Sequence, residues 1–236
     1  MWLERMYYIG MSSEIMANLT IYKWVLKLME KIVVGSDIIK MSKKRALYNE
    51  IKATQIACYL LDLNGGSMEY YKCLKLIYSI ERESIRRWLR PAIYDNLCSM
   101  PHGQVVSQTL DRSKYRTRPA KTTWSKYLST TKDESISDET KNKTLRIIQK
   151  CSTDRLSKAE IELIRAIYKA NKNKSVDEII AEHHNPVIFP EWKKTDKTSI
   201  PTKYSELLSI LGKNQEELDE FNADLDELDI LRELVS

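Results

Sequence analysis

The sequence lacks the patterns that mark cysteine-based and secreted proteins. Its four cysteines, Cys58, Cys73, Cys98 and Cys151, include no Cys-x-x-Cys pair. Cys58 and Cys73 fall within helical patterns, where a small buried hydrophobic residue is expected. The start of the chain has no cationic segment followed by a small-residue cleavage site, so a secretory signal is not indicated. These absences predict a reduced, cytoplasmic protein.

Membrane-spanning and nucleotide-binding patterns are also missing. No uncharged run approaches the roughly 20 residues that a membrane helix needs, so no membrane partner is expected. The Gly65-Gly66 pair lacks the G-x-x-x-x-G-K-[ST] pattern that holds nucleotide phosphates, and it predicts only a turn. We expect no cofactor.

Charge is present but unevenly distributed. The 236 residues carry a net charge of +5, and residues 205–236 hold ten acidic and two basic side chains, so the remainder carries +13. This asymmetry is compatible with two interpretations. Either a basic surface contacts phosphate, or the acidic tail folds against that surface. With 42% hydrophobic residues, the chain can bury one sizeable core, and we expect one domain with flanking ends.

Apolar periodicity predicts a succession of helices. The spacing of Ala53, Ile56, Ala57 and Leu60 indicates a helix from Asn49 to the Asn64-Gly65-Gly66 turn. Ser67 is the expected N-cap of a second helix, and Pro91 is expected to end it by forcing Arg90 out of helical geometry. Residues 93–104 favour a small hairpin or wing. We expect 111–143 to be a solvent-facing loop with short strands.

Capping signals recur in the second half of the chain. Ser157 with Glu160 and Ser175 with Glu178 form two capping boxes, each of which predicts a helix start. Pro201 is expected in the first turn of a further helix that ends at Gly212 and directs Leu207 and Leu208 inward. The acidic tail from Asn214 has apolar residues three and four apart, which predicts an amphipathic helix.

Together these patterns predict a mainly α fold with a small β-hairpin or wing, in which a single helical domain begins like a winged helix. The expected domains are an N-terminal extension over 1–44, a core domain over 45–212 and an acidic helix over 213–236. Residues 15–33 are expected to be helical. An alternative is that Met41, followed by Lys43-Lys44-Arg45, is the natural start of translation.

Residues of catalytic type lack the partners that catalysis needs. His102 lies near Cys98 in the sequence, but neither has a third partner or a glycine-rich elbow, so Pro101-His102-Gly103 is expected to be a turn. The adjacent His183 and His184 would point about 100° apart on a helix, which is poor geometry for one metal ion. We expect no enzymatic activity, no catalytic residues and no metal site, with His183 in a packing or capping role.

Short motifs between Lys52 and Trp192 form a recognisable series. They are Lys52-Ala53-Thr54-Gln55, Gly65-Gly66, Lys72–Leu76, Glu81-Arg82, Arg87-Trp88 and Met100-Pro101-His102-Gly103, followed by Trp124, Leu156-Ser157 and Pro190-Glu191-Trp192. The series resembles the SocA-like Panacea domain of bacterial and phage toxin–antitoxin systems. Two positions depart from the family pattern, because Gln104 stands where proline is usual and Asp95-Asn96 replaces a tighter Gly-Asp turn.

The resemblance implies an antitoxin that binds a cognate protein toxin. One relative also presents its toxin to a Clp-type protease, so an adaptor role is a further expectation. We expect toxin contacts from exposed aromatic residues and from the apolar stripe of the acidic helix. The residues selected are Trp88, Tyr94, His102, Leu218, Phe221 and Leu225. Docking of the stripe on the chain's own body is the alternative.

A DNA-binding regulator, including one that acts on its own operon, is the second function compatible with the basic body. The basic residues interleaved with Tyr115 are its best candidates for contacting operator DNA, namely Lys114, Arg116, Arg118 and Lys121. The cluster of Arg86, Arg87 and Arg90 beside Trp88 could serve similarly. We favour a solvated helix face for that cluster, with Glu81 and Glu83 as its neighbours.

Overall fold

The computed structural model describes residues 48–114, 121–196 and 198–235. The chain separates into two compact units, Met1–Lys44 and Arg45–Ser236, and all described residues belong to the second unit. The expected helix over 15–33 and the alternative start at Met41 lie outside the described residues.

The described part of the chain contains eight helices and two small three-stranded antiparallel sheets. A mainly helical fold with a small β element is therefore confirmed, whereas the winged-helix start is not. In chain order the elements are α3 (Glu50–Leu63), β1 (Ser67–Glu69), α4 (Tyr70–Trp88), β2 (Leu97–Met100), β3 (Gly103–Val106), α5 (Ser107–Ser113), α6 (Thr123–Tyr127), β4 (Leu128–Lys132), β5 (Lys143–Ile147), α7 (Lys158–Asn171), α8 (Val176–His183), β6 (Ile200–Thr202), α9 (Tyr204–Ile210) and α10 (Gln215–Val235).

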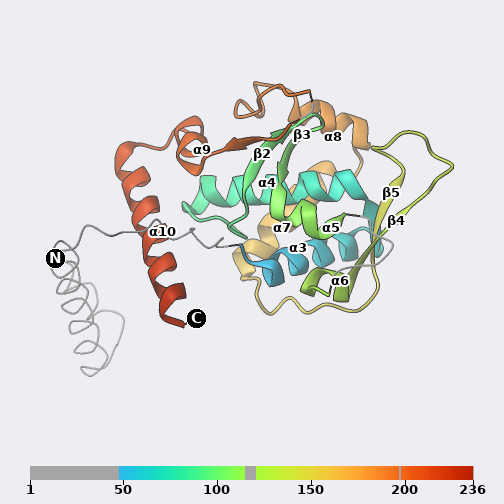
Figure 1. Ribbon diagram of the computed structural model, residues 1–236, viewed down its shortest axis with the longest axis horizontal. Helices are drawn as coiled ribbons and strands as arrows, with labels where there is room; N and C mark the ends of the chain where they lie inside the picture. The colour runs from blue at the N-terminus through green and yellow to red at the C-terminus, as the bar shows by residue number, and fades with distance from the viewer. Residues whose placement is uncertain (1–47, 115–120, 197, 236) are drawn as a thin grey trace. The chain divides into compact units, whose positions relative to one another are not determined.

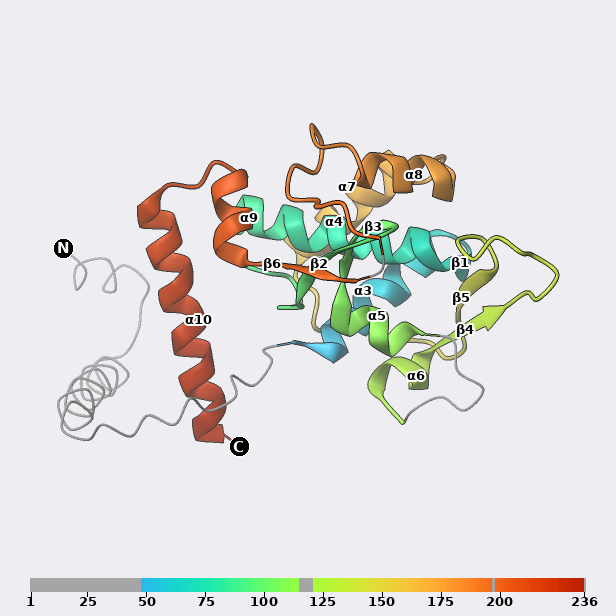
Figure 2. The same ribbon diagram turned by 45° about the horizontal axis from the view of Figure 1, so that its top comes forward.

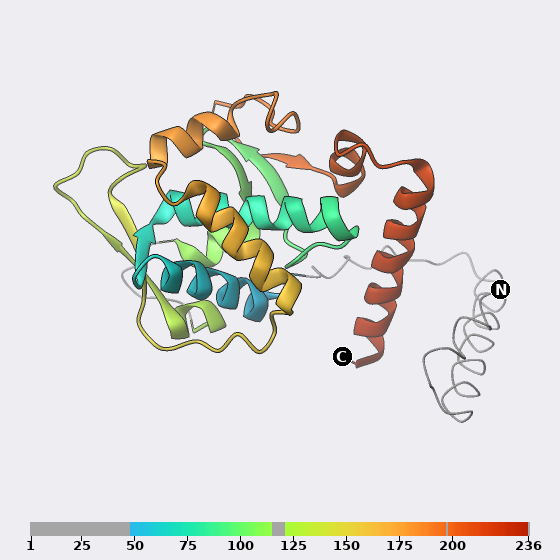
Figure 3. The same cartoon turned by 180° about the vertical axis from the view of Figure 1, so that it is seen from behind.

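Helix α4 is the central element of this unit. Figure 1 shows it running through the middle of the body, with the β2–β3 hairpin across one side, and the view from behind in Figure 3 shows α7 crossing in front of α4 on the opposite side. Its residues Leu76, Ile77 and Ile80 are almost wholly buried, and they join the main hydrophobic cluster with residues of α3 and α7. Burial of this face supplies the main favourable free energy of the fold.

Helix α3 begins as predicted, because the Asn49 side chain accepts a hydrogen bond from the backbone N–H of Lys52. The expectation that Ser67 caps the next helix is wrong. Ser67 pairs with Arg146 at the start of β1, and α4 begins only at Tyr70, after an N-cap residue, Glu69, that makes no side-chain bond. The distant strand β5 offers these residues backbone partners that a local pattern does not reveal.

Helix α4 ends earlier than expected. Its last residue is Trp88, and Leu89 takes a left-handed conformation with φ of 50°. The Leu89 N–H still bonds the Ile85 carbonyl at 3.0 Å. Pro91 is therefore not the residue that ends the helix, because Leu89 has already turned the chain.

The predicted hairpin is confirmed, and it belongs to a larger sheet. Strands β2 and β3 pair antiparallel and close at Pro101-His102, while β6 pairs with the other side of β2. Pro201 stands in β6 opposite Cys98, so the expectation that it opens a helix is wrong. An edge strand tolerates proline because its outward backbone groups need no ladder partner. Leu207 and Leu208 are fully buried in α9, as predicted.

Residues 111–143 are more ordered than the expected loop. The described part of this stretch contains the end of α5, the short helix α6 and strand β4, and it places Trp124 in the core at 2% exposure. Strands β4 and β5 form the long hairpin seen at the edge of the body in Figures 1 and 2. The two predicted capping boxes are confirmed, at Ser157 for α7 and at Ser175 for α8.

Candidate functional site

Lys75 on α4 lies in the interior beneath the β2–β3 hairpin. Its side chain is fully buried, and its Nζ donates a 2.6 Å hydrogen bond to the carbonyl oxygen of Gln104. Burial lowers the pKa of Lys75 well below its ordinary value, because a charged ammonium loses its hydration there. This motif lysine therefore holds the hairpin by a buried hydrogen bond.

The motif glycine Gly103 permits the hairpin to approach α8. Its φ is +88°, and a Cβ at this position would lie 2.8 Å from the Cβ of His183 and 3.0 Å from the Nζ of Lys75. Both the left-handed conformation and the close approach favour glycine. The turn and the helix are thus in direct contact.

Two buried carboxyl groups organise the segment after α4. Glu81 accepts hydrogen bonds from the N–H groups of Ile93 at 2.8 Å and Asp95 at 3.2 Å. Asp95 in turn accepts from the N–H groups of Gln108 and Thr109, each at 2.8 Å. Burial raises the pKa of Glu81 to about 7. The pair fixes residues 93–95 against the first turn of α5.

The neighbouring residue, Arg82, faces the other way and holds the 185–191 loop. Its Nε lies 2.6 Å from Oε1 of Glu191, whose side chain is fully buried. Tyr78 donates to the same oxygen at 2.9 Å. The guanidinium also lies 5.2 Å from the ring centroid of Phe189. The Glu81-Arg82 motif therefore ties two separate segments to one helix.

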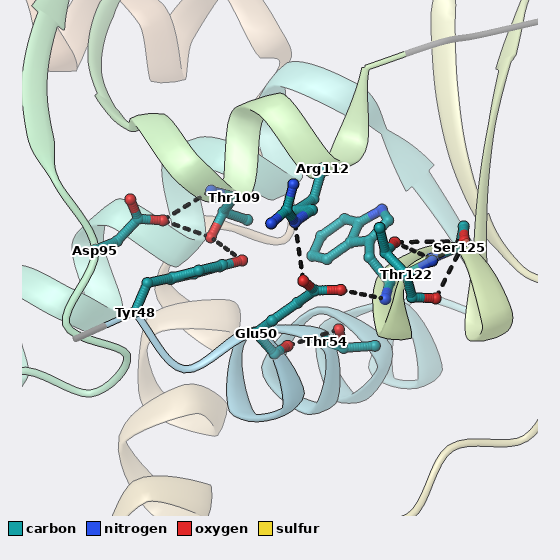
Figure 4. A network of polar contacts seen from close by, with 9 residues as sticks. Tyr48, Glu50, Thr54, Asp95, Thr109, Arg112, Thr122 and Ser125 are labelled. Atoms are coloured by element: carbon teal, nitrogen blue, oxygen red, sulfur yellow. Dashed lines mark hydrogen bonds and ion pairs between the residues drawn. The ribbon is translucent and has the colours of Figure 1, made fainter. Parts of the chain in front are cut away.

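A third polar network joins α3 to α5 and α6 (Figure 4). Glu50 accepts from Arg112 at 2.8 Å and from the backbone N–H of Trp124 at 3.0 Å. The Thr109 hydroxyl lies 2.7 Å from Asp95 and 3.2 Å from the Tyr48 hydroxyl. Burial raises the pKa of Tyr48. These contacts satisfy polar groups at the start of α3 and serve the scaffold.

The residues selected from the sequence do not form one cluster. His102 lies at the hairpin turn, where its ring makes an edge contact with Tyr71 at 5.5 Å. Trp88, at 39% exposure, lies at the opposite end of α4, about 25 Å away from Tyr71 along a helix that rises 1.5 Å per residue. Tyr94 is near that second end, has φ of 56° and accepts from Arg90 Nε at 3.3 Å.

The side chains of His183 and Cys98 are packed in the interior. His183 is 2% exposed and stacks on Phe189 with ring centroids 4.1 Å apart, so its predicted packing role is confirmed. Cys98 is buried, and burial raises the pKa of its thiol to about 11. Such a thiol stays protonated near neutral pH.

The basic candidates are engaged locally where the structure describes them. Lys114 lies 2.5 Å from Asp111, and Lys121 is exposed. Arg116 and Arg118 lie outside the described residues. Arg86 and Arg87 both bond Glu83, which agrees with the expected solvated helix face. The expectation that Glu81 is also a neighbour of this cluster is wrong, because Glu81 is fully buried and bonds the backbone after α4.

The apolar stripe of α10 is partly used within the chain. Phe221 is 1% exposed, and its ring centroid lies 5.5 Å from that of Tyr204 on α9. Leu218 and Leu225 are partly buried against the core. Exposed carboxylates on α10, such as those of Glu220 and Asp224, face solvent. The first half of the helix is therefore docked on its own body.

Sequence reasoning missed one exposed apolar feature. Val187 is 87% exposed and Ile188 is 44% exposed, both in the loop between α8 and the buried Glu191. The available signal was a Val-Ile pair between Pro186 and Pro190, because a proline-bounded loop is expected at the surface.

None of the helices in the described ranges combines the length and apolar character that crossing a bilayer requires. In the same ranges, no three His, Cys, Asp or Glu side chains gather closely enough to hold a metal ion. Searches of curated proteins and of solved structures each found no match. A comparison with protein families matches residues 74–193, just over half of the chain, to the antitoxin SocA-like Panacea domain. This match spans Lys75, Glu81, Arg82, the hairpin and Glu191, and the chain therefore belongs to the SocA-like Panacea antitoxin family.

Proposed function

We propose that the protein is an antitoxin that neutralises a cognate protein toxin by direct, stoichiometric binding, without catalysis and without a cofactor. The observation that carries the proposal is that the motif side chains form hydrogen bonds and ion pairs within the protein. Lys75, Glu81, Arg82 and Glu191 bond the backbone or one another in the interior. Family membership, which implies a toxin partner, supports the same reading. The motif then serves as a rigid scaffold for a binding surface.

Binding alone is energetically sufficient for this function. A toxin held at nanomolar strength corresponds to about 12 kcal/mol. A few well-buried aromatic and aliphatic anchors supply most of such an energy. Turnover is not needed, because a toxin that is held in a complex is already inactive.

The test is co-expression with the neighbouring reading frames. Each neighbour is induced in a tolerant host with and without this protein, and growth and co-purification are measured. Growth arrest that this protein relieves, together with a stable complex of the two chains, supports the proposal. Arrest without relief, or no arrest from any neighbour, contradicts it.

Two finer roles can be separated by further measurements. For an adaptor of a Clp-type protease, the half-life of the toxin would fall in the presence of the antitoxin and recover in a protease-deficient host. For a DNA-binding regulator, promoter binding would decline steeply as salt rises. Direct binding is our proposal because three of the described basic candidates, Lys114, Arg86 and Arg87, are already paired with carboxylates.

A further inference from the structure

The 185–191 loop, Asn185-Pro186-Val187-Ile188-Phe189-Pro190-Glu191, exposes two β-branched side chains at its tip. Val187 has the largest exposed fraction of the large hydrophobic residues in the described part of the chain, at 87%, and the next residue in the sequence, Ile188, is 44% exposed. Single exposed aliphatic residues are ordinary on protein surfaces. This adjacent pair is informative because hydrogen bonds and a buried ion pair fix the loop on both sides of it.

The backbone of the loop is fixed at its start. The N–H of Val187 donates to Oδ1 of Asn185 at 2.9 Å. The N–H groups of Ile188 and Phe189 both donate to the Asn185 carbonyl, at 3.1 and 2.8 Å. Asn185 thus forms a compact turn that presents Val187 outward.

The end of the loop is fixed by buried groups. Phe189 is 7% exposed and stacks on His183. Glu191 is fully buried and bonds Arg82 at 2.6 Å, while Arg82 Nη2 donates to the Ile188 carbonyl at 3.3 Å. Removing one partner of a buried ion pair is strongly destabilising, so this pair opposes displacement of the loop. The apolar tip is therefore held in place before any partner arrives.

The chemistry of the tip defines the site that it fits. Residues 185–189 carry no charge, so a complementary pocket needs no counter-ion. A charged group in that pocket would be buried without a partner, which costs free energy. A pre-ordered pair of β-branched side chains loses little conformational entropy on binding. The matching surface is an apolar pocket about two aliphatic side chains wide.

We propose that Val187 and Ile188 are the apolar anchors of the toxin-binding surface and that they insert into an apolar pocket of the toxin. The inference rests on the proposed antitoxin function and adds to it the contact and the kind of pocket. The family motif residues Arg82 and Glu191 then have a shared purpose, which is to hold this tip rigid.

The test compares the full chain with a double variant, V187S/I188S. Binding to the tagged, purified product of the neighbouring reading frame is measured by calorimetry. We expect the dissociation constant to rise at least about 30-fold, as for hot-spot side chains. The matched control is Ile148→Ser, which removes an isoleucine of 59% exposure from the loop after β5. The control should bind within about threefold of the wild-type chain.

The outcomes separate this inference from the proposed function. Wild-type affinity in V187S/I188S, with the wild-type chain still relieving toxicity, overturns the anchor alone and leaves the antitoxin in place. A wild-type chain that binds no neighbouring product overturns both. A wild-type dimer that the double variant converts to monomers without loss of toxin affinity assigns the tip to self-association and overturns the anchor. Equal melting temperatures of the three chains exclude misfolding as the cause of any loss.

Discussion

At the scale of single residues, Gln104 is the least satisfied polar side chain of the hairpin. It is fully buried, and both atoms of its amide lack a hydrogen-bond partner in the described part of the chain. It faces Ser99 one pair beyond the closing pair of Met100 and Gly103. Pairs that exchange backbone hydrogen bonds alternate with pairs that do not, so the backbone N–H and C=O of Gln104 point away from β2. The hydrogen bond from Lys75 to the Gln104 carbonyl agrees with this orientation.

We expect Gln104→Pro to fold and to raise the free energy of unfolding by about 1 to 2 kcal/mol. It removes a buried amide without partners, and proline needs no ladder hydrogen bond at an edge position. Urea denaturation measures the change. Gln104→Ala is the control, because it removes the same amide but leaves a cavity, and it should gain less. A loss of stability in the proline variant would contradict this expectation and show that the hairpin needs the Gln104 N–H or a φ that proline cannot adopt.

Glu81 makes stability depend on pH. Burial raises its folded-state pKa to about 7 from an ordinary value of 4.5, so the folded protein holds this proton more tightly than the unfolded chain does. The contribution is fully present below about pH 4.5 and is lost as pH rises through 7. The loss amounts to roughly 3 kcal/mol by the linkage between protons and stability.

We therefore expect Glu81→Gln to flatten the decline in unfolding free energy between pH 5 and pH 8. Urea titrations of both proteins at these two pH values give the comparison. The partly buried Glu83 lies on the same helix, and Glu83→Gln is the matched control. It should keep the wild-type slope, because the Glu83 carboxylate already has a low pKa of about 2 from its bonds to Arg86 and Arg87. An unchanged slope in Glu81→Gln would assign the pH dependence to another group.

At the scale of elements, the ion pair of Arg82 and Glu191 joins α4 to the 185–191 loop. We expect Arg82→Ala to lower the free energy of unfolding by about 3 to 5 kcal/mol, because it leaves a fully buried carboxylate without its cation. Arg87→Ala is the control on the same helix. Its guanidinium pairs with Glu83 at 44% exposure, so its loss should cost less than about 1 kcal/mol. Similar losses in the two variants would contradict the role of the buried pair.

The elements that the sequence predicts well carry their own start signals. Asn49, Ser157 and Ser175 cap helices through bonds to residues three positions later, and such bonds can be recognised within one short segment. Strands β1 and β6 have three residues each, and each pairs with a strand far away in the sequence. No local periodicity exists in so short a strand, so Ser67 and Pro201 were misassigned.

Prediction of the candidate site was limited for a related reason. The motif identified Arg82 and Glu191, but their pairing across more than a hundred residues is a property of the folded chain. The exposure of Val187 depends on how that pair orients the loop. Phe221 was selected as a partner contact, and its packing on Tyr204 depends on the position of α9. The sequence gives the type of each residue, but the direction in which its side chain points depends on the folded chain.

At the scale of the whole molecule, negative charge is concentrated in the C-terminal helix and the rest of the chain is basic. Residues 214–236 hold nine acidic side chains and one basic one, so their deletion raises the net charge from +5 to +13. Their carboxylates offset the attraction of the remaining chain for polyanions. We therefore expect the helix to limit non-specific binding to nucleic acid.

We expect the chain truncated after Lys213 to elute from heparin at a higher salt concentration than the full chain. A full-length variant with Glu220→Gln, Asp224→Asn and Glu227→Gln keeps Phe221 docked and has a net charge of +8, so it should elute between the two. Identical elution of all three proteins would mean that the acidic helix does not screen the basic surface.

The strand order β3-β2-β6 also sets when the fold can be completed during synthesis. Strand β2 lacks its second neighbour until residues 200–202 have left the ribosome, and β1 likewise waits for residues 143–147. Contacts so distant in sequence form late. Incomplete translation products that end before residue 200 therefore lack the finished β3-β2-β6 sheet.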